Sequence, residues 1–375
     1  MQTTFGIEEE FMLLDPVTLV PVEAARAVMA ALGADGARGG AGSSATGESH
    51  GSPTGEFFAS QIEHPSPVFT RLEEARAALG AFRDDLASAA GGLGLLAAST
   101  GAPFSMRDDA ALSPEHRYRA IAEQFRAIVP DHQINGLHVH VGVPSREAAV
   151  VAMNRLRPWL PALLALSANS PFWRGRDTGF DSWRAIHSRR WTTYGIPPRF
   201  RDAADYDART AALRGVGGTT DAGTLNWVAR PSERFPTVEV RVFDAQTDVE
   251  SSIALAALTR GLVASPEDPP VVEAELLDAS LWHAARDGIR GQLLDPTSGT
   301  MQPAPVVIDA LVRAASTGLD AHGDEETVRT FVTAVFADGN GAERQRGAYA
   351  AGGVSGLALH SRAGAARGGV AAGLG

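Results

Sequence analysis

Four short segments of the chain combine acidic, imidazole or guanidinium side chains with apolar neighbours of the kind found in strands. They are Gly6-Ile7-Glu8-Glu9-Glu10, Gln61-Ile62-Glu63-His64, Gly136-Leu137-His138-Val139-His140 and Val238-Glu239-Val240-Arg241. Successive side chains of a strand point to opposite faces, so each segment can present polar groups on one face and apolar groups on the other. Carboxylates and imidazoles gathered on one face repel one another or lose hydration unless they share a cation. The pattern therefore predicts strands that line a site for a metal ion carrying phosphate.

The spacing within two of these segments places like residues on one face. Glu8 and Glu10 are two positions apart, and so are His138 and His140. Two neighbouring carboxylates resist joint ionisation unless a cation lies between them, although an acidic pair on a solvated strand edge has the same spacing. A single histidine in a strand is more often hydrogen-bonded than metal-bound. Two on one face between apolar neighbours make the metal or phosphate hypothesis about as strong as the structural one.

The remaining acidic positions are more ambiguous. Glu239 and Arg241 also share a face, but a Glu-Arg pair in a strand is usually an ion pair. Glu63 ends an apolar run, and Glu56 begins that run seven residues earlier. An odd spacing puts these two side chains on opposite faces of an ideal strand. A bulge, or a coil position for Glu56, is required if both bind metal.

A stretch rich in arginine and tryptophan follows in the middle of the chain. It contains Arg174, Arg176, Arg184, Arg189, Arg190, Arg199 and Arg201, with Trp173, Trp183 and Trp191 among them. In a basic protein this composition would suggest binding to nucleic acid. In an acidic chain it favours a wall that binds a small anion, or a solvated surface.

Composition narrows the function classes. The 375 residues are 44% hydrophobic and 21% charged, as in a globular protein. A net charge of -11 argues against nucleic acid or an anionic membrane as the main partner. The absence of cysteine excludes disulfides and thiolate chemistry, and all 33 basic residues are arginine, which excludes a P-loop lysine and a Schiff base. The acidic amino terminus shows no signal peptide, and no apolar run reaches about 18 residues, so we expect a soluble cytoplasmic protein.

Apolar periodicity and turn residues predict the elements that must position these groups. Strands are expected at 3–14, 57–62, 93–99, 134–143 and 237–243, and helices at 24–32, 68–90, 113–128, 145–168 and 249–264. Pro158 and Pro161 should kink the fourth of these helices. Residues 33–55 read as a mobile loop and candidate lid, residues 169–223 as irregular binding loops, and the region from 265 to about 349 as helices.

Strands concentrated in the first two thirds of the chain, with helices between and after them, predict the α+β class. We expect a largely antiparallel sheet lined with metal-binding acids and covered by helices. Length alone allows one large domain or two of ordinary size, and residues 361–375 are expected to form a flexible tail. A homodimer is one option for the oligomeric state.

The ordered set of motifs resembles the bacterial type-2 glutamate-cysteine ligase family, whose fold is similar to that of glutamine synthetase. The resemblance spans nearly the whole chain and implies a single catalytic domain at 1–360. It rests on Phe5-Gly6-Ile7-Glu8-Glu9-Glu10-Phe11, Glu56, Gln61-Ile62-Glu63, Gly136-Leu137-His138-Val139-His140-Val141, Leu166-Ser167-Ala168-Asn169-Ser170-Pro171-Phe172-Trp173, Asp177-Thr178-Gly179-Phe180, Arg230-Pro231, Thr237-Val238-Glu239-Val240-Arg241, Trp282, Ala285-Arg286-Asp287-Gly288 and Arg344-Gln345-Arg346.

This resemblance implies a role for each member of the set. Glu8, Glu56 and Glu63 would hold one divalent ion, and the remaining metal ligands, a second group, would be Glu10, His138 and Glu239. His140 and Arg241 would bind the nucleotide phosphates, with Arg241 and Arg230 as the catalytic candidates for the transferred phosphoryl group. Mg²⁺ suits oxygen ligands, and an imidazole ligand makes Mn²⁺ an alternative.

The implied reaction is ATP-dependent joining of a carboxylate to an amine through an acyl phosphate. The default substrates are the γ-carboxylate of glutamate and the amine of cysteine. Several positions depart from the family pattern and bear on the pocket, and hence on these substrates. Ala102 replaces a His, Val228 replaces the Asp of Trp-Asp-x-Arg-Pro, Ser280 replaces an Asn, and His64 replaces a small residue.

Two other classes of function remain open. A metal-dependent hydrolase could use the His138 and His140 pair, although such enzymes usually carry that pair near the start of the chain with more His or Asp ligands downstream. A non-catalytic relative could keep the nucleotide site after losing substrate residues.

Overall fold

A seven-stranded sheet forms the centre of the molecule in the computed structural model, which describes residues 3–36 and 51–364. The strand order is β2-β3-β1-β5-β9-β8, with β4 paired to β1, and every pairing is antiparallel. The strands of this sheet are β1 (Phe5–Leu14), β2 (Thr54–Gly55), β3 (Gln61–Pro65), β4 (Leu96–Ala98), β5 (Gly136–Gly142), β8 (Ala229–Pro231) and β9 (Thr237–Asp244). Two hairpins stand apart from it, β6 (Phe172–Trp173) with β7 (Arg176–Asp177) and β10 (Gln292–Asp295) with β11 (Thr300–Pro303).

Helices account for most of the remaining described chain. They are α1 (Ala25–Gly36), α2 (Leu72–Gly92), α3 (His116–Phe125), α4 (Arg146–Leu156), α5 (Leu160–Ser167), α6 (Trp183–Ser188), α7 (Ala203–Gly215), α8 (Val249–Ala264), α9 (Ala274–Asp287), α10 (Ala304–His322), α11 (Glu325–Asp338) and α12 (Gly341–His360). Polar side chains accept main-chain N–H bonds at the starts of several helices, as Ser145 does for α4 and Asp248 for α8. Among the described residues, no helix combines the length and apolar character needed to cross a bilayer.

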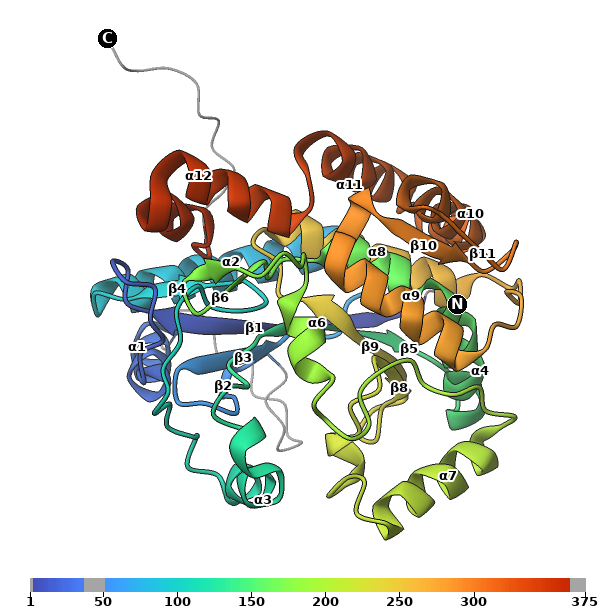
Figure 1. Cartoon of the computed structure of the whole chain (residues 1–375), viewed down its shortest axis with the longest axis horizontal. Coiled ribbons are helices and arrows are strands. Elements are labelled where there is room, and N and C mark those ends of the chain that lie inside the picture. The colour runs from blue at the N-terminus through green and yellow to red at the C-terminus, as the bar shows by residue number, and fades with distance from the viewer. Residues whose placement is uncertain (1–2, 37–50, 365–375) are drawn as a thin grey trace.

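The two sides of the sheet are covered unequally (Figure 1). Helices α2, α8, α10, α11 and α12 lie on one side, and α3 and α7 stand on the other. The alternation of β1 explains the division. Its odd-numbered residues Phe5 and Ile7 pack into the large apolar core beneath α2 and α8, which leaves Glu8 on the opposite side.

Glu9 also points to the helix-covered side, where it forms a buried ion pair with Arg83 of α2. Two carboxylate–guanidinium contacts of 2.6 and 3.1 Å join them, and Ser252 of α8 donates to the same carboxylate at 2.7 Å. Arg83 further donates to the carbonyls of Gln246 and Thr247. This network ties β1 to the helices and keeps neighbouring acids of the same strand apart.

The expected strands at 3–14, 134–143 and 237–243 are confirmed, but the strand expected at 57–62 is wrong. Residues 57–60 form a turn, in which the Phe58 amide donates to Gln61 Oε1 at 3.1 Å, and β3 begins only at Gln61. The Gln61 amide also donates to the Phe58 carbonyl at 2.9 Å, which closes the turn. Glu56 consequently lies in coil between β2 and this turn, one of the two arrangements required for it to share a face with Glu63.

The helix expected after Ser145 is interrupted near the predicted kink, since a 3₁₀ turn at Arg157–Trp159 separates α4 from α5. The region at 169–223 is more ordered than predicted and holds β6, β7, α6 and α7. The region predicted as wholly helical contains the β10–β11 hairpin. Strands β6, β7, β10 and β11 and helix α6 have two to six residues each, too few to show a clear apolar period.

The predicted loop at 33–55 is only partly described. Helix α1 extends to Gly36, Thr54–Gly55 pairs with β3, and residues 37–50 lie outside the described part of the chain. Of the predicted tail, residues 361–364 lie against β4, with the Ala363 amide donating to the Ala97 carbonyl at 2.9 Å. Residues 365–375 are again outside the described part.

Candidate active site

Strand register brings the predicted residues into one row across the open face of the sheet. Directly opposed pairs are Glu10 with Glu63, Glu8 with His138, His140 with Glu239, and Glu239 with Arg230. Opposed residues of antiparallel strands project from the same face. The row therefore runs over β3, β1, β5, β9 and β8 in turn, from positions up to 231 residues apart in the sequence, as from Glu8 to Glu239.

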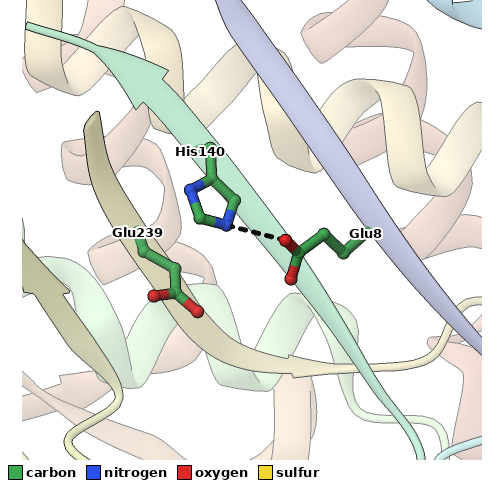
Figure 2. Close-up of side chains that lie close together, drawn as sticks. All are labelled: Glu8, His140 and Glu239. Atoms are coloured by element: carbon green, nitrogen blue, oxygen red, sulfur yellow. Dashed lines mark ion pairs between the residues drawn. The ribbon is translucent and has the colours of Figure 1, made fainter. Parts of the chain in front are cut away.

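Glu8 lies between the two histidines of β5. Its Oε2 is 3.0 Å from His138 Nδ1, and its Oε1 is 3.3 Å from His140 Nε2. Figure 2 shows Glu8, His140 and Glu239 converging from three strands, with the contact between His140 and Glu8 marked. On its other ring nitrogen, His140 is 3.0 Å from the Thr237 hydroxyl, which fixes the orientation of the imidazole.

Glu239 is held by two guanidinium groups. Arg230 donates through Nε to Glu239 Oε2 at 2.9 Å, and Arg241 donates through Nη1 to Oε1. Arg230 also donates to the carbonyls of Gly223 and Leu225, so it connects β9 to the loop before β8. Arg230 thus orients Glu239, whereas direct contact of Arg230 with a bound anion stays a prediction.

Two further carboxylates, those of Glu10 and Glu56, lie on the β3 side of the row. Glu10 accepts the Gly136 amide at 2.6 Å and lies 3.7 Å from His138 Nε2. Glu56 accepts the Tyr118 hydroxyl of α3 at 2.8 Å. The sequence did not single out Tyr118, because a tyrosine in a short amphipathic helix has no distinguishing pattern.

Two triads bring single ligand atoms within 4.8 Å of one another, namely Glu8, Glu63 and His138, and Glu8, His140 and Glu239. Glu8 belongs to both triads. This grouping differs from the partition that the family resemblance implies, in which Glu8 and Glu239 serve separate ions.

Burial and mutual repulsion perturb the acids nearest β3. Burial raises the pKa of Glu63 well above its usual value, and the charges of Glu56, Glu8 and Glu10 raise it further. Burial, followed by the charge of Glu56, raises the pKa of Glu10 to about 7. Carboxylates that are costly to ionise next to one another are suited to a site completed by a cation.

The other half of the row is already balanced by positive or hydrogen-bonding partners. Burial alone would raise the pKa of Glu239, but the charges of Arg241 and Arg230 bring it well below the usual value. Burial and the charge of Arg241 lower the pKa of His138 to about 4, so its imidazole is neutral at pH 7. A neutral ring that donates from Nδ1 to Glu8 carries its lone pair on Nε2, which can bind a metal.

A cavity of about 170 Å³ adjoins this row. One wall consists of site residues, including Glu10, His138 and Arg241. The remaining lining residues are Glu56, Phe57, Gln61, Arg117, Tyr118, Ile121, His132, Ile134, Arg184, Ser188, Trp191, Tyr194, Gly223, Thr224, Asn226 and Val228. A larger cavity of about 620 Å³ lies between α2, α8, α11 and α12, and no predicted site residue lines it.

The departures from the family pattern lie at different distances from this cavity. Val228 lines it. Ala102 is buried with Ile134 and Trp173, and Ser280 accepts the Leu294 amide through its hydroxyl at 2.9 Å. His64 stacks on Phe82 with ring centroids 3.6 Å apart. Among these four positions only Val228 is in the cavity lining.

Comparison with solved structures confirms the α+β fold class. The chain superposes on glutamate–cysteine ligase from Francisella tularensis in complex with AMP with a TM-score of 0.66 at 12% identity, covering 96% of this chain and 88% of that one. It superposes on a bifunctional glutathione synthetase from Pasteurella multocida with a TM-score of 0.69 at 12% identity, covering 96% and 52% of the respective chains. The chain therefore shares its fold with a glutamate–cysteine ligase and a glutathione synthetase, and acids and arginines line the open face of its sheet.

Sequence comparison assigns the chain to a protein family. The family model described as glutamate-cysteine ligase family 2 matches residues 4–370. The chain is 38% identical over 357 residues to "Putative glutamate–cysteine ligase 2-2" of Saccharopolyspora erythraea, covering 93% of this chain and 89% of the relative. It is 39% identical over 350 residues to "Putative glutamate–cysteine ligase 2" of Salinispora arenicola, covering 92% and 89%. The chain belongs to glutamate-cysteine ligase family 2, and this membership favours the ligase hypothesis over the hydrolase and the non-catalytic alternative.

Proposed function

We propose that the protein joins the γ-carboxylate of glutamate to the amine of cysteine at the expense of ATP. The observation that carries the proposal is the row of acids, imidazoles and arginines on one face of the sheet in a chain of this family. We further propose that residues 1–360 act as one catalytic domain.

The donor set fits divalent ions of the kind that accompany ATP. We propose that Glu8, Glu10, Glu56, Glu63, His138 and Glu239 hold them, with Glu8 shared between the two triads. The charges of Glu8, Glu10 and Glu56 all raise the pKa of Glu63, so these four carboxylates lie close together. Their oxygens suit Mg²⁺. Such ions, when bound, neutralise charge on the phosphates and polarise the transferred phosphoryl group.

The residues of the chain serve two chemical steps. A carboxylate oxygen of glutamate attacks the γ-phosphorus of ATP, and ADP leaves, which gives an acyl phosphate. The cysteine amine then attacks the acyl carbon, phosphate leaves, and the nitrogen loses a proton. Arg241 borders the cavity and can neutralise the phosphoryl group during transfer, while His140 lies on the same row for the nucleotide phosphates.

The test is amine-dependent release of ADP by variants of the proposed metal ligands. We expect Glu63→Gln and Glu239→Gln to abolish it while circular dichroism shows the fold retained. Glu250→Gln is the matched control, because Glu250 is an exposed acid of α8 paired with Arg76. Undiminished turnover in both site variants would contradict the metal assignment.

The substrates are tested separately from the metal site. Purified protein with ATP and Mg²⁺ is supplied with glutamate and cysteine, each alone and together, and the product is identified by mass spectrometry. We expect γ-glutamylcysteine and one ADP for each amide formed. ADP release that requires a different acid or amine would keep the ligase class and overturn these substrates.

A further inference from the structure

Gln61, the first residue of β3, joins two segments of the chain through its side chain. The residue is 1% exposed and lines the cavity beside the row. Its Oε1 accepts the Phe58 amide at 3.1 Å, and its Nε2 donates to the Ile134 carbonyl at 2.9 Å and to Asn135 Oδ1 at 2.7 Å. The side chain therefore fastens the turn at residues 57–60 to the segment that leads into β5.

The main chain of Gln61 restrains Glu56. The Glu56 amide donates to the Gln61 carbonyl at 3.4 Å, and the Gln61 amide donates to the Phe58 carbonyl at 2.9 Å. Glu56 lies in coil between β2 and the turn, so a strand ladder does not fix its backbone. The turn that Gln61 closes is therefore a restraint on the backbone that carries this carboxylate.

Two further carboxylates of the row are connected to the same side chain. Glu63 is two positions along β3 and shares a face with Gln61. Asn135, which accepts from Gln61, precedes Gly136, whose amide donates to Glu10 at 2.6 Å. One amide group thus links the backbones of three acids from three parts of the chain.

These three acids repel one another before a cation binds. Burial raises the pKa of both Glu10 and Glu63, and the charge of Glu56 raises each further. Repulsion of this kind displaces most easily the carboxylate whose backbone is least constrained, which is that of Glu56 in its coil segment. A glutamine suits the restraining position, because its amide supplies an acceptor and two donors without adding charge to the cluster.

We propose that Gln61 is a positioning residue that holds Glu56 beside Glu10 and Glu63 at the spacing a divalent ion requires. The inference rests on the proposed function, because these acids are proposed metal ligands. Gln61 acts through them, since its oxygen and both of its N–H donors already bond within the protein. Hydrogen-bonding partners behind metal ligands typically contribute about 10- to 100-fold to metal affinity.

The experiment measures binding of Mg²⁺ alone to the full chain by calorimetry. We expect Gln61→Met, which keeps the side-chain length, to weaken Mg²⁺ binding about 10- to 100-fold. Gln133→Met is the matched control. Gln133 is fully buried, accepts the Arg107 amide, donates to the carbonyls of Arg107 and Pro130, and is absent from the cavity lining. Both variants should lose similar stability in urea unfolding, but Gln133→Met should bind Mg²⁺ within about twofold of the wild type.

Two further readouts separate ligand spacing from folding. Mg²⁺ requires ligand distances of about 2.0–2.1 Å in near-octahedral geometry, whereas Ca²⁺ accepts about 2.3–2.6 Å in flexible geometry. Gln61→Met should therefore lose about threefold or less in Ca²⁺ affinity. Asn135→Ala is the milder variant, because it removes one acceptor of Gln61 while Asn135 Nδ2 has no acceptor among the described residues. It should weaken Mg²⁺ binding about 3- to 10-fold even if Gln61→Met does not fold.

The proposal is overturned if Gln61→Met or, where that variant does not fold, Asn135→Ala binds Mg²⁺ as tightly as the wild type. It is also overturned if Gln133→Met weakens Mg²⁺ binding as much, or if Gln61→Met loses Mg²⁺ and Ca²⁺ affinity equally. Failure of the proposed function looks different. If the substrates are wrong, the Mg²⁺ results stand while glutamate and cysteine release no ADP. If the metal assignment is wrong, Glu63→Gln binds Mg²⁺ as the wild type does, and the positioning role is overturned with it.

Discussion

Glu9 and Glu10 are adjacent in sequence but should respond to the same substitution in opposite ways. Glu9 is 1% exposed on the helix-covered side, where it accepts two bonds from Arg83 and one from Ser252. Glu10 faces the open side, where its carboxyl accepts the Gly136 amide. We expect Glu9→Gln to cost stability and Glu10→Gln to cost catalysis.

The expected loss of stability in Glu9→Gln follows from the burial of Arg83, the ion-pair partner of Glu9. The change leaves the Arg83 guanidinium inside the protein without its counter-charge, which typically costs about 3–5 kcal/mol. Carbonyls of Gln246 and Thr247 still accept from Arg83, so we expect the lower half of that range. Replacing both partners by apolar residues, as in Glu9→Leu with Arg83→Met, should cost less than Glu9→Gln alone, since no charge is left buried.

Glu10→Gln should keep the fold at neutral pH. Burial raises the pKa of Glu10 to about 7, so its ionised form is disfavoured without a cation, and an uncharged amide relieves this cost. The amide oxygen can still accept the Gly136 N–H. The free energy of unfolding should therefore be unchanged or higher in metal-free protein, while amine-dependent ADP release is lost.

Urea unfolding of metal-free protein, followed by circular dichroism, and ADP release at a temperature where all variants are folded provide the two measurements. The reasoning is refuted if Glu9→Gln abolishes ADP release without lowering stability. It is equally refuted if Glu10→Gln lowers the free energy of unfolding as much as Glu9→Gln does.

Two other predictions concern residues that adjoin the row. Tyr118→Phe removes the bond to Glu56 and should lower Mg²⁺ affinity about tenfold, measured by calorimetry; unchanged affinity would contradict a role in holding that ligand. His132 accepts the Trp191 indole N–H, and burial lowers its pKa well below 6.5, so the unfolded state binds more protons as pH falls below about 6.5. Below about pH 6.5 the free energy of unfolding of the wild type should therefore fall relative to that of His132→Gln, by up to about 1.4 kcal/mol per pH unit. Urea titrations at pH 7 and pH 5 measure this, and equal losses in the two proteins would contradict the prediction.

The sequence predicted which side chains share a face because strand periodicity is strict. Glu8 with Glu10, and His138 with His140, could be assigned to one face from their spacing. The pairing of strands could not be derived in the same way, since a register depends on how turns and cores fit together across long separations. Only the structure shows that Glu8 opposes His138 and that His140 opposes Glu239.

Residues in turns and short elements were harder to place from the sequence. The strand predicted at 57–62 failed because Gln61 bonds to the Phe58 amide and closes a turn, which apolar periodicity does not register. Arg184, Trp191 and Tyr194, which line the cavity, lie in a region without apolar period, where a high content of arginine and tryptophan was the only sequence signal.

The distribution of departures from the family pattern separates chemistry from specificity. The motif residues on the open face of the sheet match the family throughout, whereas Val228 puts an apolar side chain into the cavity at a position where the family pattern has an aspartate. An aspartate there would stand in the same cavity as Arg184 and Arg241, and could offset part of their positive charge. Without it, the described residues that line the cavity beyond the proposed metal ligands include guanidinium groups and no carboxylate. We therefore expect the substrate end of this site to favour a negatively charged ligand, while the proposed phosphoryl-transfer end keeps the residues of the family pattern.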